Sequence, residues 1–431
     1  MAQREKVTRR RFLKRTAACA LGGLAAPEIV GRAVLGGQGA PGANERVNVG
    51  FIGTGHRARL LMNQMPAGGE IVAICDVFLT RCNEARNEPN LKDKAAKWRV
   101  YQDYRKLLEE KDIQGVVVPT TDHGRVLPCI HACQAGKDIY AEKPLTLTIH
   151  EGRVLVNAVR KHKRVFQTGS QQRSMEMNRY ACELVRTGGI GKLREVLGCN
   201  YTGPGTCEGF PEEPIPAGLD WDMWCAQTRL KPYNSRLHFG WMGCKDYSGG
   251  EMTNWGAHGL DQVQWALGAD DAGPVEIWPE SEGPNGKVSM RYASGVEVKL
   301  ELASGPMGGA IFIGDKGKIE IDRNRFTATP PELVKDPPEP QKAEIWEGPG
   351  WQAKYHIQNL LDCIKTRARP VADVEIGHRS ISVCHLANIV RTVGRKLQWD
   401  PRAEKFVGDE EADAYLERPK RKGYELPDPL Y

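Results

Sequence analysis

The sequence predicts an α/β protein with two different sheets: an N-terminal doubly wound parallel sheet, and a C-terminal α/β domain whose open sheet is largely antiparallel. Two observations support this. Between residues 47 and 168, short apolar segments alternate with helical segments over short connections. Between residues 193 and 321, five strand-like segments occur, and residues 296–302 alternate between apolar and charged side chains. Strict alternation is typical of an antiparallel strand with one face in water.

The first 43 residues have the pattern of an export signal. Residues 8–14 read Thr-Arg-Arg-Arg-Phe-Leu-Lys, and a weakly apolar stretch follows them. Glu28 and Arg32 interrupt this stretch too early for the roughly 20 apolar residues that a membrane span needs. The arginine pair before Phe-Leu-Lys resembles a twin-arginine signal, whose pathway carries folded proteins. We therefore expect residues 1–43 to be a signal and linker, and an exported, periplasmic protein that meets the twin-arginine machinery and has no stable membrane span.

The distribution of charge argues against a nucleic-acid partner. The chain of 431 residues has a formal net charge of +6. Residues 1–43 contain eight basic and two acidic residues, so the remainder of the chain is neutral overall. A nucleic-acid-binding protein needs a basic surface on its folded part.

The cysteines predict neither a metal centre nor a disulfide framework. The chain has 12 cysteines, and no two of them are spaced Cys-x-x-Cys. Cys129 and Cys133 lie four residues apart beside His131, which could be half of a metal site, but two buried core thiols are the favoured interpretation. We expect the protein to fold in a reducing compartment.

A nucleotide-binding motif opens the predicted parallel sheet. An apolar strand at residues 47–53 ends in the pattern Gly-x-Gly-x-x-Ala, formed by Gly53, Gly55 and Ala58, and a helix follows. The first glycine permits a tight turn, the second lets a diphosphate approach the backbone, and the alanine allows close helix–strand packing. A second strand ends at Asp76, where a carboxylate can bind ribose hydroxyls. This predicts a Rossmann domain over residues 44–168 that prefers NAD, although nearby Arg81 leaves NADP open.

Lys143 is the first candidate for chemistry. The segment Glu142-Lys143-Pro144 follows a strand at residues 138–141, at the sheet edge where such folds bind ligands. An ammonium group there can hydrogen-bond a substrate oxygen, and partial burial would let it transfer a proton. The alternative is a surface turn held by the proline.

At this point the sequence resembles the Gfo/Idh/MocA oxidoreductases. The resemblance rests on five segments and spans most of residues 46–431: residues 50–55, 103–105, 121–123, 135–145 and 167–173. It implies that Lys143 is catalytic and that a domain at residues 169–431 binds substrate and forms oligomers. The cofactor contacts that we expect are Gly53, Thr54, Gly55, His56, Arg57, Asp76, Thr120, His123, Glu142 and Lys143.

A second group of candidates lies in the C-terminal half. Asn254, His258 and Asp261 are spaced so that one helix would present all three on one face. His258 could act as an acid or base, or could be a structural histidine. Members of the family commonly have Asp-x-x-x-His here, whereas this chain has Asn254, whose amide cannot take a proton. We expect Lys143, His258 and Asn254 to be catalytic and Tyr201 and Asp261 to bind substrate, although Tyr201 could equally be a core residue.

Together these features predict an NAD(P)-dependent oxidoreductase that acts on a sugar, polyol or glycoside, without a metal. Because free NAD is scarce outside the cytosol, we expect a tightly bound cofactor that is restored within each turnover. The alternatives are a redox-neutral enzyme that cleaves or epimerises glycosides, and a non-catalytic sugar-binding protein. A homo-oligomer formed through the antiparallel sheet is expected from fold analogy.

Overall fold

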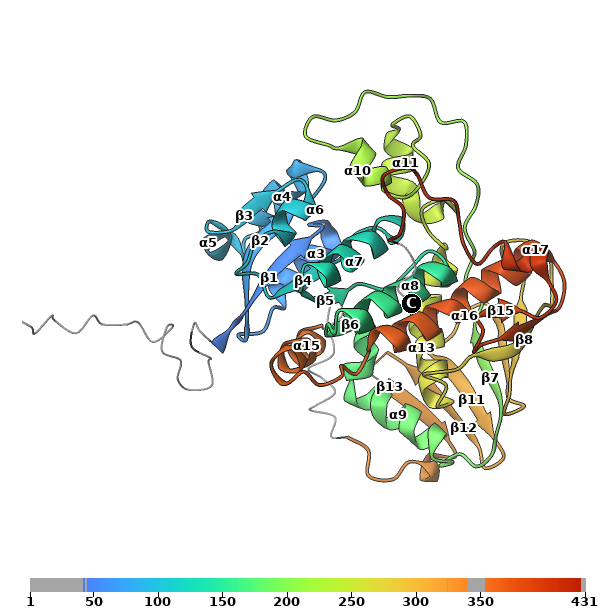
Figure 1. Ribbon diagram of the computed structural model, residues 1–431. Coiled ribbons are helices and arrows are strands. Elements are labelled where there is room, and N and C mark those ends of the chain that lie inside the picture. The colour runs from blue at the N-terminus through green and yellow to red at the C-terminus, as the bar shows by residue number, and fades with distance from the viewer. Residues whose placement is uncertain (1–41, 43–44, 324, 339–352, 428–431) are drawn as a thin grey trace, which may run out of the picture. The chain divides into compact units, whose positions relative to one another are not determined.

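The computed structural model describes residues 42, 45–323, 325–338 and 353–427. The predicted signal and linker at residues 1–43 lie outside these ranges, apart from Gly42. Residues 47–431 form one compact unit, shown in Figure 1. The predicted division into domains at residues 168 and 169 stays a prediction.

The first sheet has six strands, all parallel, in the order β3-β2-β1-β4-β5-β6. Its strands are β1 (Val47–Ile52), β2 (Gly69–Cys75), β3 (Arg99–Tyr101), β4 (Gly115–Val118), β5 (Asp138–Ala141) and β6 (Phe166–Thr168). The helices and 3-10 turns of this half are α3 (His56–Asn63), α4 (Leu79–Arg86), α5 (Lys92–Ala95), α6 (Tyr104–Leu108), η2 (Asp122–Gly124), α7 (Val126–Gln134), α8 (Ile149–Lys161) and η3 (Gln171–Ser174). The predicted doubly wound parallel sheet is confirmed, and β3 is a strand that the sequence did not reveal.

The second sheet has nine strands, in the order β13-β12-β11-β7-β10-β9-β8-β14-β15. Its strands are β7 (Leu193–Cys199), β8 (Pro274–Pro279), β9 (Val288–Tyr292), β10 (Glu297–Leu302), β11 (Ala310–Gly314), β12 (Lys318–Asp322), β13 (Arg325–Thr329), β14 (Leu397–Asp400) and β15 (Lys405–Phe406). Among the described strands of this second sheet, only β7 and β10 pair in parallel, so the sheet is largely antiparallel, as predicted. Val298 and Leu300 of β10 are buried, as the alternation indicates.

Helices from the second half cover one face of this sheet and also reach the first sheet (Figure 1). The helices and 3-10 turns of this half are α9 (Glu176–Arg186), α10 (Trp221–Cys225), α11 (Ser235–Gly240), η4 (Trp241–Gly243), α12 (Glu251–Asn254), α13 (Gly256–Ala266), η5 (Pro331–Leu333), α15 (Lys354–Thr366), α16 (Val374–Val393) and α17 (Glu410–Asp413), and α9, α13 and α16 are the ones that pack on the sheet. Ile357, Leu360 and Leu361 of α15 share a hydrophobic core with β1 and α3. The C-terminal half therefore completes the core of the parallel sheet.

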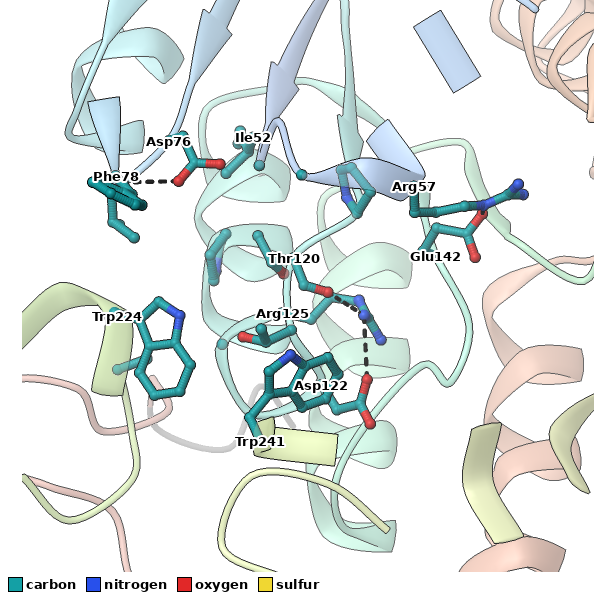
Figure 2. Close-up of a pocket in the computed structure, with 18 of the residues that line it drawn as sticks. Ile52, Arg57, Asp76, Phe78, Thr120, Asp122, Arg125, Glu142, Trp224 and Trp241 are labelled. Carbon is teal, nitrogen blue, oxygen red and sulfur yellow. Dashed lines mark hydrogen bonds and ion pairs between the residues drawn. The ribbon is translucent and has the colours of Figure 1, made fainter. Parts of the chain in front are cut away.

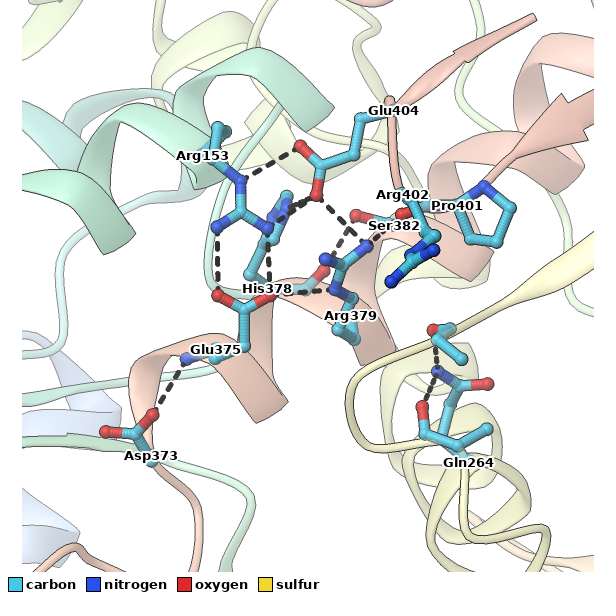
Figure 3. A network of polar contacts seen from close by, with 12 residues as sticks. Arg153, Gln264, Asp373, Glu375, His378, Arg379, Ser382, Pro401, Arg402 and Glu404 are labelled. Carbon is cyan, nitrogen blue, oxygen red and sulfur yellow. Dashed lines mark hydrogen bonds and ion pairs between the residues drawn. The ribbon is translucent and has the colours of Figure 1, made fainter. Parts of the chain in front are cut away.

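A charged network joins α8 to α16 and to the β14–β15 turn (Figure 3). Arg153 of α8 pairs with Glu375 at 2.8 Å and with Glu404 at 2.6 Å. His378 Nε2 lies 2.8 Å from Glu404 Oε1, and Arg379 pairs with Glu375 at 2.8 Å. Burial opposes the charge on Glu375, but Arg153 outweighs it and lowers the pKa of Glu375 to about 2. The carboxylates and guanidinium groups of the network consequently stay charged at neutral pH and tie the two halves together.

One expectation about cysteine needs correction. Cys207 and Cys244 form a disulfide across 37 residues. The Sγ atoms meet because Gly205 pairs with Cys244 in an isolated bridge, a long-range contact that cysteine spacing alone does not reveal. Residues 207–244, hereafter the cover segment, are thus closed into a loop that contains α10 and α11.

The other nine cysteines of the described residues are free and buried. Cys129 and Cys133 are among them, and burial raises the pKa of both thiols. In the part of the chain that the structure describes, no three acidic, histidine or cysteine residues are grouped as metal ligands. No helix in that part is long and apolar enough to cross a membrane.

Candidate active site

A cavity of about 530 Å³ lies at the carboxyl edge of the parallel sheet, where ligands bind in this type of fold. The segments that follow four different strands line it, because parallel strands end at the same edge. Gly53 follows β1, Asp76 follows β2, Thr120 follows β4, and Lys143 follows β5. Figure 2 shows Trp224 and Trp241 of the cover segment across this cavity from Asp76 and Phe78.

The β1–α3 turn has the shape of a diphosphate cradle. Gly53 has a φ of +99°, a conformation that side chains rarely adopt. A Cβ on Gly55 would meet no atom within 4 Å, so the backbone here faces open space. Gly55 is also the N-cap of α3, and no side chain caps this helix end. Its first N–H groups are therefore available to an anion, as the sequence motif predicts.

Asp76 is held in place for a ribose. The backbone N–H of Thr54 donates to Oδ2 at 2.7 Å, the Thr54 hydroxyl donates to the same oxygen at 3.1 Å, and the N–H of Phe78 donates to Oδ1 at 2.9 Å. Burial raises the pKa of Asp76, while these hydrogen bonds and Arg81 oppose the rise. Oδ1 accepts only one of these bonds and so keeps a lone pair for a hydroxyl group. Thr54 does not line the cavity, and its side chain positions Asp76.

The residues that follow β4 and β5 add polar groups beside the cradle. The buried hydroxyl of Thr120 has no hydrogen-bond partner among the described residues, so it is available to a ligand in the cavity. Glu142 pairs with Arg57 at 2.8 Å. Burial opposes the charge on Glu142, but Arg57 and Lys143 outweigh it and lower its pKa. The cradle, Asp76 and Thr120 together fit a dinucleotide, and His56 lies exposed at the mouth.

Lys143 reaches across to the second half of the chain. Its Nζ donates to Oδ1 of Asn254 at 2.6 Å and to the backbone oxygen of the same residue at 3.2 Å. Burial lowers the pKa of Lys143 to about 8, against the opposing charges of Glu142 and Asp122. The structure therefore brings together two of the three predicted catalytic residues, with a lysine close to the pKa that proton transfer at neutral pH requires.

His258 lies in the first turn of α13, which begins at Gly256, two residues beyond the end of α12 at Asn254. It is buried and does not line the cavity. Burial, followed by the charges of Arg323 and Lys143, holds its pKa well below the usual range. The imidazole is therefore neutral at physiological pH, and the nearby charge of Lys143 helps to keep it neutral.

Asp261 is bound by protein groups instead of facing the cavity. Nε of Arg173 donates to both of its oxygens at 2.9 Å, and the Ser380 hydroxyl donates at 2.7 Å. The Arg173 guanidinium also pairs with Asp270 at 2.7 Å. Both Arg173 and Asp261 are almost completely buried. Asn254, His258 and Asp261 are thus spaced for one helix face, yet they lie in three different environments, and only Asn254 lines the cavity.

Two further predicted residues also lie outside the cavity lining. His123 is buried, with Nε2 2.8 Å from the backbone oxygen of Trp224, and burial lowers its pKa to about 3. Its ring packs against Trp224 and Tyr247. The Tyr201 hydroxyl lies 3.5 Å from the N–H of Gly308, and burial raises its pKa to about 12. His123 holds the cover segment, and Tyr201 contacts the loop that packs on His258.

The sequence did not single out several residues that line the cavity. Trp224 lies in residues 219–224, whose aromatic and polar composition suits stacking on a sugar, although the sequence favours a packed loop there. Trp241, Tyr424 and Arg125 carried no signal. Arg125 donates hydrogen bonds to the backbone oxygens of Thr120 (Figure 2) and Pro144, and so fixes the segments that follow β4 and β5.

A parallel sheet with a glycine cradle, a ribose-binding carboxylate and a half-buried lysine at one edge defines a dinucleotide-binding α/β protein of the oxidoreductase class. The oxidoreductase family's NAD-binding Rossmann fold matches residues 47–170, and its C-terminal alpha/beta domain matches residues 200–426. The chain belongs to the Gfo/Idh/MocA oxidoreductase family, which confirms the resemblance found in the sequence.

Known relatives agree with this assignment. An inositol 2-dehydrogenase of Salmonella typhimurium (strain LT2) is 29% identical over 156 residues, 36% of this chain and 44% of that protein. A 2,7-anhydro-N-acetylneuraminate hydratase of Mediterraneibacter gnavus is 25% identical over 228 residues, 50% of this chain and 53% of that protein. The chain thus spans about half the length of these curated relatives. The solved structure of levoglucosan dehydrogenase with NADH and L-sorbose has the same fold, with a TM-score of 0.60 at 16% identity over 82% of this chain and 99% of that one.

Proposed function

We propose that this protein is an NAD-dependent oxidoreductase that oxidises a hydroxyl group of a sugar, polyol or glycoside. The observation that carries the proposal is the Lys143–Asn254 contact, which places a lysine with a pKa of about 8 at the mouth of the dinucleotide cradle. The relatives named above include an inositol dehydrogenase and a levoglucosan dehydrogenase, which supports a polyhydroxylated substrate. Asp76 favours NAD because a carboxylate would repel a 2′-phosphate.

The polar residues around Lys143 have separate roles in the proposed oxidation. A bound nicotinamide would accept the hydride of the alcohol carbon. Neutral Lys143 takes the proton of the hydroxyl group, and the Asn254 amide holds the lysine in position. The neutral imidazole of His258, with its low pKa, does not compete for that proton. Glu142 pairs with Arg57 at 2.8 Å, so the charge of this buried carboxylate stays compensated when Lys143 is neutral.

We further propose that the protein is exported and keeps its cofactor through the cycle. The twin-arginine pattern at residues 8–14 supports export, and the Cys207–Cys244 disulfide is consistent with an oxidising compartment. Because free NAD is scarce there, the hydride returns to a second substrate or to the same molecule. The hydratase among the relatives carries a name that denotes no net oxidation, which supports a redox-neutral reaction as the second candidate function. Formation of a homo-oligomer stays a prediction.

The first experiment is to purify the protein folded, denature it and identify any released nucleotide by mass. We expect NAD or NADH in near-stoichiometric amount, because the cover segment lies across the cavity from Asp76 (Figure 2). The folded protein is then mixed with a panel of aldoses, polyols and glycosides, and absorbance at 340 nm reports reduction of the bound cofactor in a single turnover. A protein that neither carries nor binds NAD or NADP would contradict the proposal. Sustained release of NADH into solution would contradict cofactor retention alone.

The pH profile of oxidation should follow the pKa of Lys143. Oxidation requires the neutral amine, so the rate should rise as the pH passes through about 8. In Asn254→Asp a carboxylate would stand where Oδ1 now lies 2.6 Å from Nζ. It stabilises the ammonium form and raises the pKa of Lys143, so the rising limb should move about one to two pH units higher. Steady-state rates measured from pH 6 to 11 check this.

Two variants act as controls for that shift. Asn254→Ala removes an acceptor of the ammonium group, so the limb should move to lower pH. Glu251→Gln changes an exposed side chain that accepts a hydrogen bond from Asn254 Nδ2 at 3.0 Å, on the side of the amide away from Oδ1, and it should leave the limb in place. A profile that is identical in Asn254→Asp, Asn254→Ala and the native protein would show that another group titrates.

A further inference from the structure

The cover segment, residues 207–244, contacts the Rossmann half at the adenosine end of the cradle. Residues that directly follow Asp76 bind it: the Asp220 N–H donates to the Val77 oxygen at 2.8 Å, and the Leu79 N–H donates to the Gly218 oxygen at 3.0 Å. The Gln102 side chain donates to the same Gly218 oxygen at 3.0 Å. The cover segment is therefore hydrogen-bonded to the loop that carries the ribose-binding carboxylate.

The same segment supplies aromatic rings to this end of the cavity. His238 and Phe239 line it together with Phe78 and Arg81 of the Rossmann half. The His238 ring stacks on Phe239 at 4.5 Å and lies 5.9 Å from the Phe78 ring. Phe239 is 60% exposed, a large exposed area for a phenyl ring that lines a cavity. Burial lowers the pKa of His238 to about 4, so its ring is neutral and suited to stack on a base.

Two structural features hold the cover segment in place beside the cavity. The first is the Cys207–Cys244 disulfide at its two ends. The second is the C-terminal tail, which Figure 1 shows running back from α17 toward α10 and α11. Arg421 of the tail pairs with Asp222, and the Tyr424 hydroxyl donates to the same carboxylate at 2.7 Å. Tyr424 itself lines the cavity.

The tail is in turn anchored on the Rossmann half. Arg418 and Lys420 pair with Glu151 of α8 at 2.9 and 3.1 Å. Glu151 is completely buried, and these two cations lower its pKa to about 2 in spite of burial. Arg418 also donates to the Thr228 hydroxyl at 2.7 Å. These ion pairs stay charged at neutral pH. The disulfide therefore joins the two ends of the cover segment, and the C-terminal tail links the segment to α8.

We propose that the cover segment forms the outer wall of the adenosine pocket, with Phe239 and His238 against the adenine, and that its disulfide sets the rate at which the dinucleotide leaves. The proposal rests on the proposed function, since it requires a dinucleotide in the cradle. Opening the segment breaks its contacts with residues 77–79 and exposes the adenosine end. Release of the cofactor therefore becomes slow once the disulfide has formed.

The test loads the full-length protein with NADH, adds excess NAD⁺, and follows the loss of bound NADH fluorescence. We expect dissociation about tenfold faster in Phe239→Ala, because base–aromatic stacking of about 1–3 kcal/mol is lost. Leu230→Ala is the matched control, since Leu230 is an exposed apolar residue of the same segment that does not line the cavity. Reduced nicotinamide mononucleotide, which lacks the adenosine, should bind the native protein and Phe239→Ala equally.

Reduction of the disulfide tests the second part. Treatment of the native protein with dithiothreitol should speed NADH release by about tenfold, because the cover segment then opens more often. The double variant Cys207→Ser, Cys244→Ser should release NADH at the fast rate with or without reductant. If this variant fails to fold, the reductant experiment and the Phe239 and Leu230 variants still decide the question.

Unchanged NADH release in both the reduced protein and Phe239→Ala would overturn the proposal. An equal effect of Phe239→Ala on the mononucleotide would also overturn it, because the ring would then act away from the adenine. Either result would leave the proposed function intact, since NADH still binds. Failure of the native protein to bind NADH at all would instead contradict the proposed function.

Discussion

Lys143→Met should abolish turnover while the protein still binds NAD. The substitution removes the group that takes the hydroxyl proton, and loss of a positioned acid–base residue lowers rates by about 10²- to 10⁴-fold. Methionine keeps most of the side-chain volume, and loss of a buried charge does not by itself destabilise a core. The measurements are the single-turnover rate at 340 nm and NADH affinity by fluorescence.

Lys137→Met is the matched control. Lys137 is a buried lysine whose Nζ donates to the backbone oxygen of Ile113 at 2.9 Å, but it does not line the cavity. Its replacement should lower stability and leave turnover unchanged. Full turnover in Lys143→Met would place the chemistry elsewhere. A native protein that binds sugars with no turnover to lose would favour the non-catalytic binding protein.

Arg173→Met should lower the free energy of unfolding by about 3–5 kcal/mol, the effect expected when one partner of a buried ion pair is removed. Asp261 is almost completely buried and would keep only the Ser380 hydroxyl as a donor. The cost is the desolvation of a carboxylate that has lost its cation. Chemical denaturation at pH 7, followed by tryptophan fluorescence, measures the change.

Asp270→Asn provides the comparison, because Asp270 is the other carboxylate on Arg173 but is 35% exposed. Water screens that pair, so we expect a loss of about 1 kcal/mol or less. Asp261→Asn should also be less stable than the native protein, and the fraction that folds should keep its KM for substrate. A raised KM with normal stability would return Asp261 to the substrate site, as the sequence first suggested.

The sequence reveals features that depend on neighbouring residues. The alternation of apolar and helical segments predicts the parallel sheet because a buried strand and an amphipathic helix each have their own periodicity. The cradle at Gly53 and Gly55 and the carboxylate Asp76 are likewise encoded in short motifs, since a strand, a turn and a helix N-terminus fix their geometry. The position of Lys143 can also be predicted from the sequence, because the end of β5 brings it to the sheet edge where the other strands end.

Only the tertiary structure decides which groups those residues meet. Lys143 contacts Asn254, 111 residues away, and the contact helps to orient an amine whose pKa burial lowers to about 8. Asp261 has the spacing of a site residue, yet Arg173 binds it because η3 packs beside α13. Cys207 pairs with Cys244, and the tail fastens the cover segment, through contacts that no local pattern encodes. Backbone conformation follows from adjacent residues, whereas partners, burial and pKa values depend on how distant segments pack.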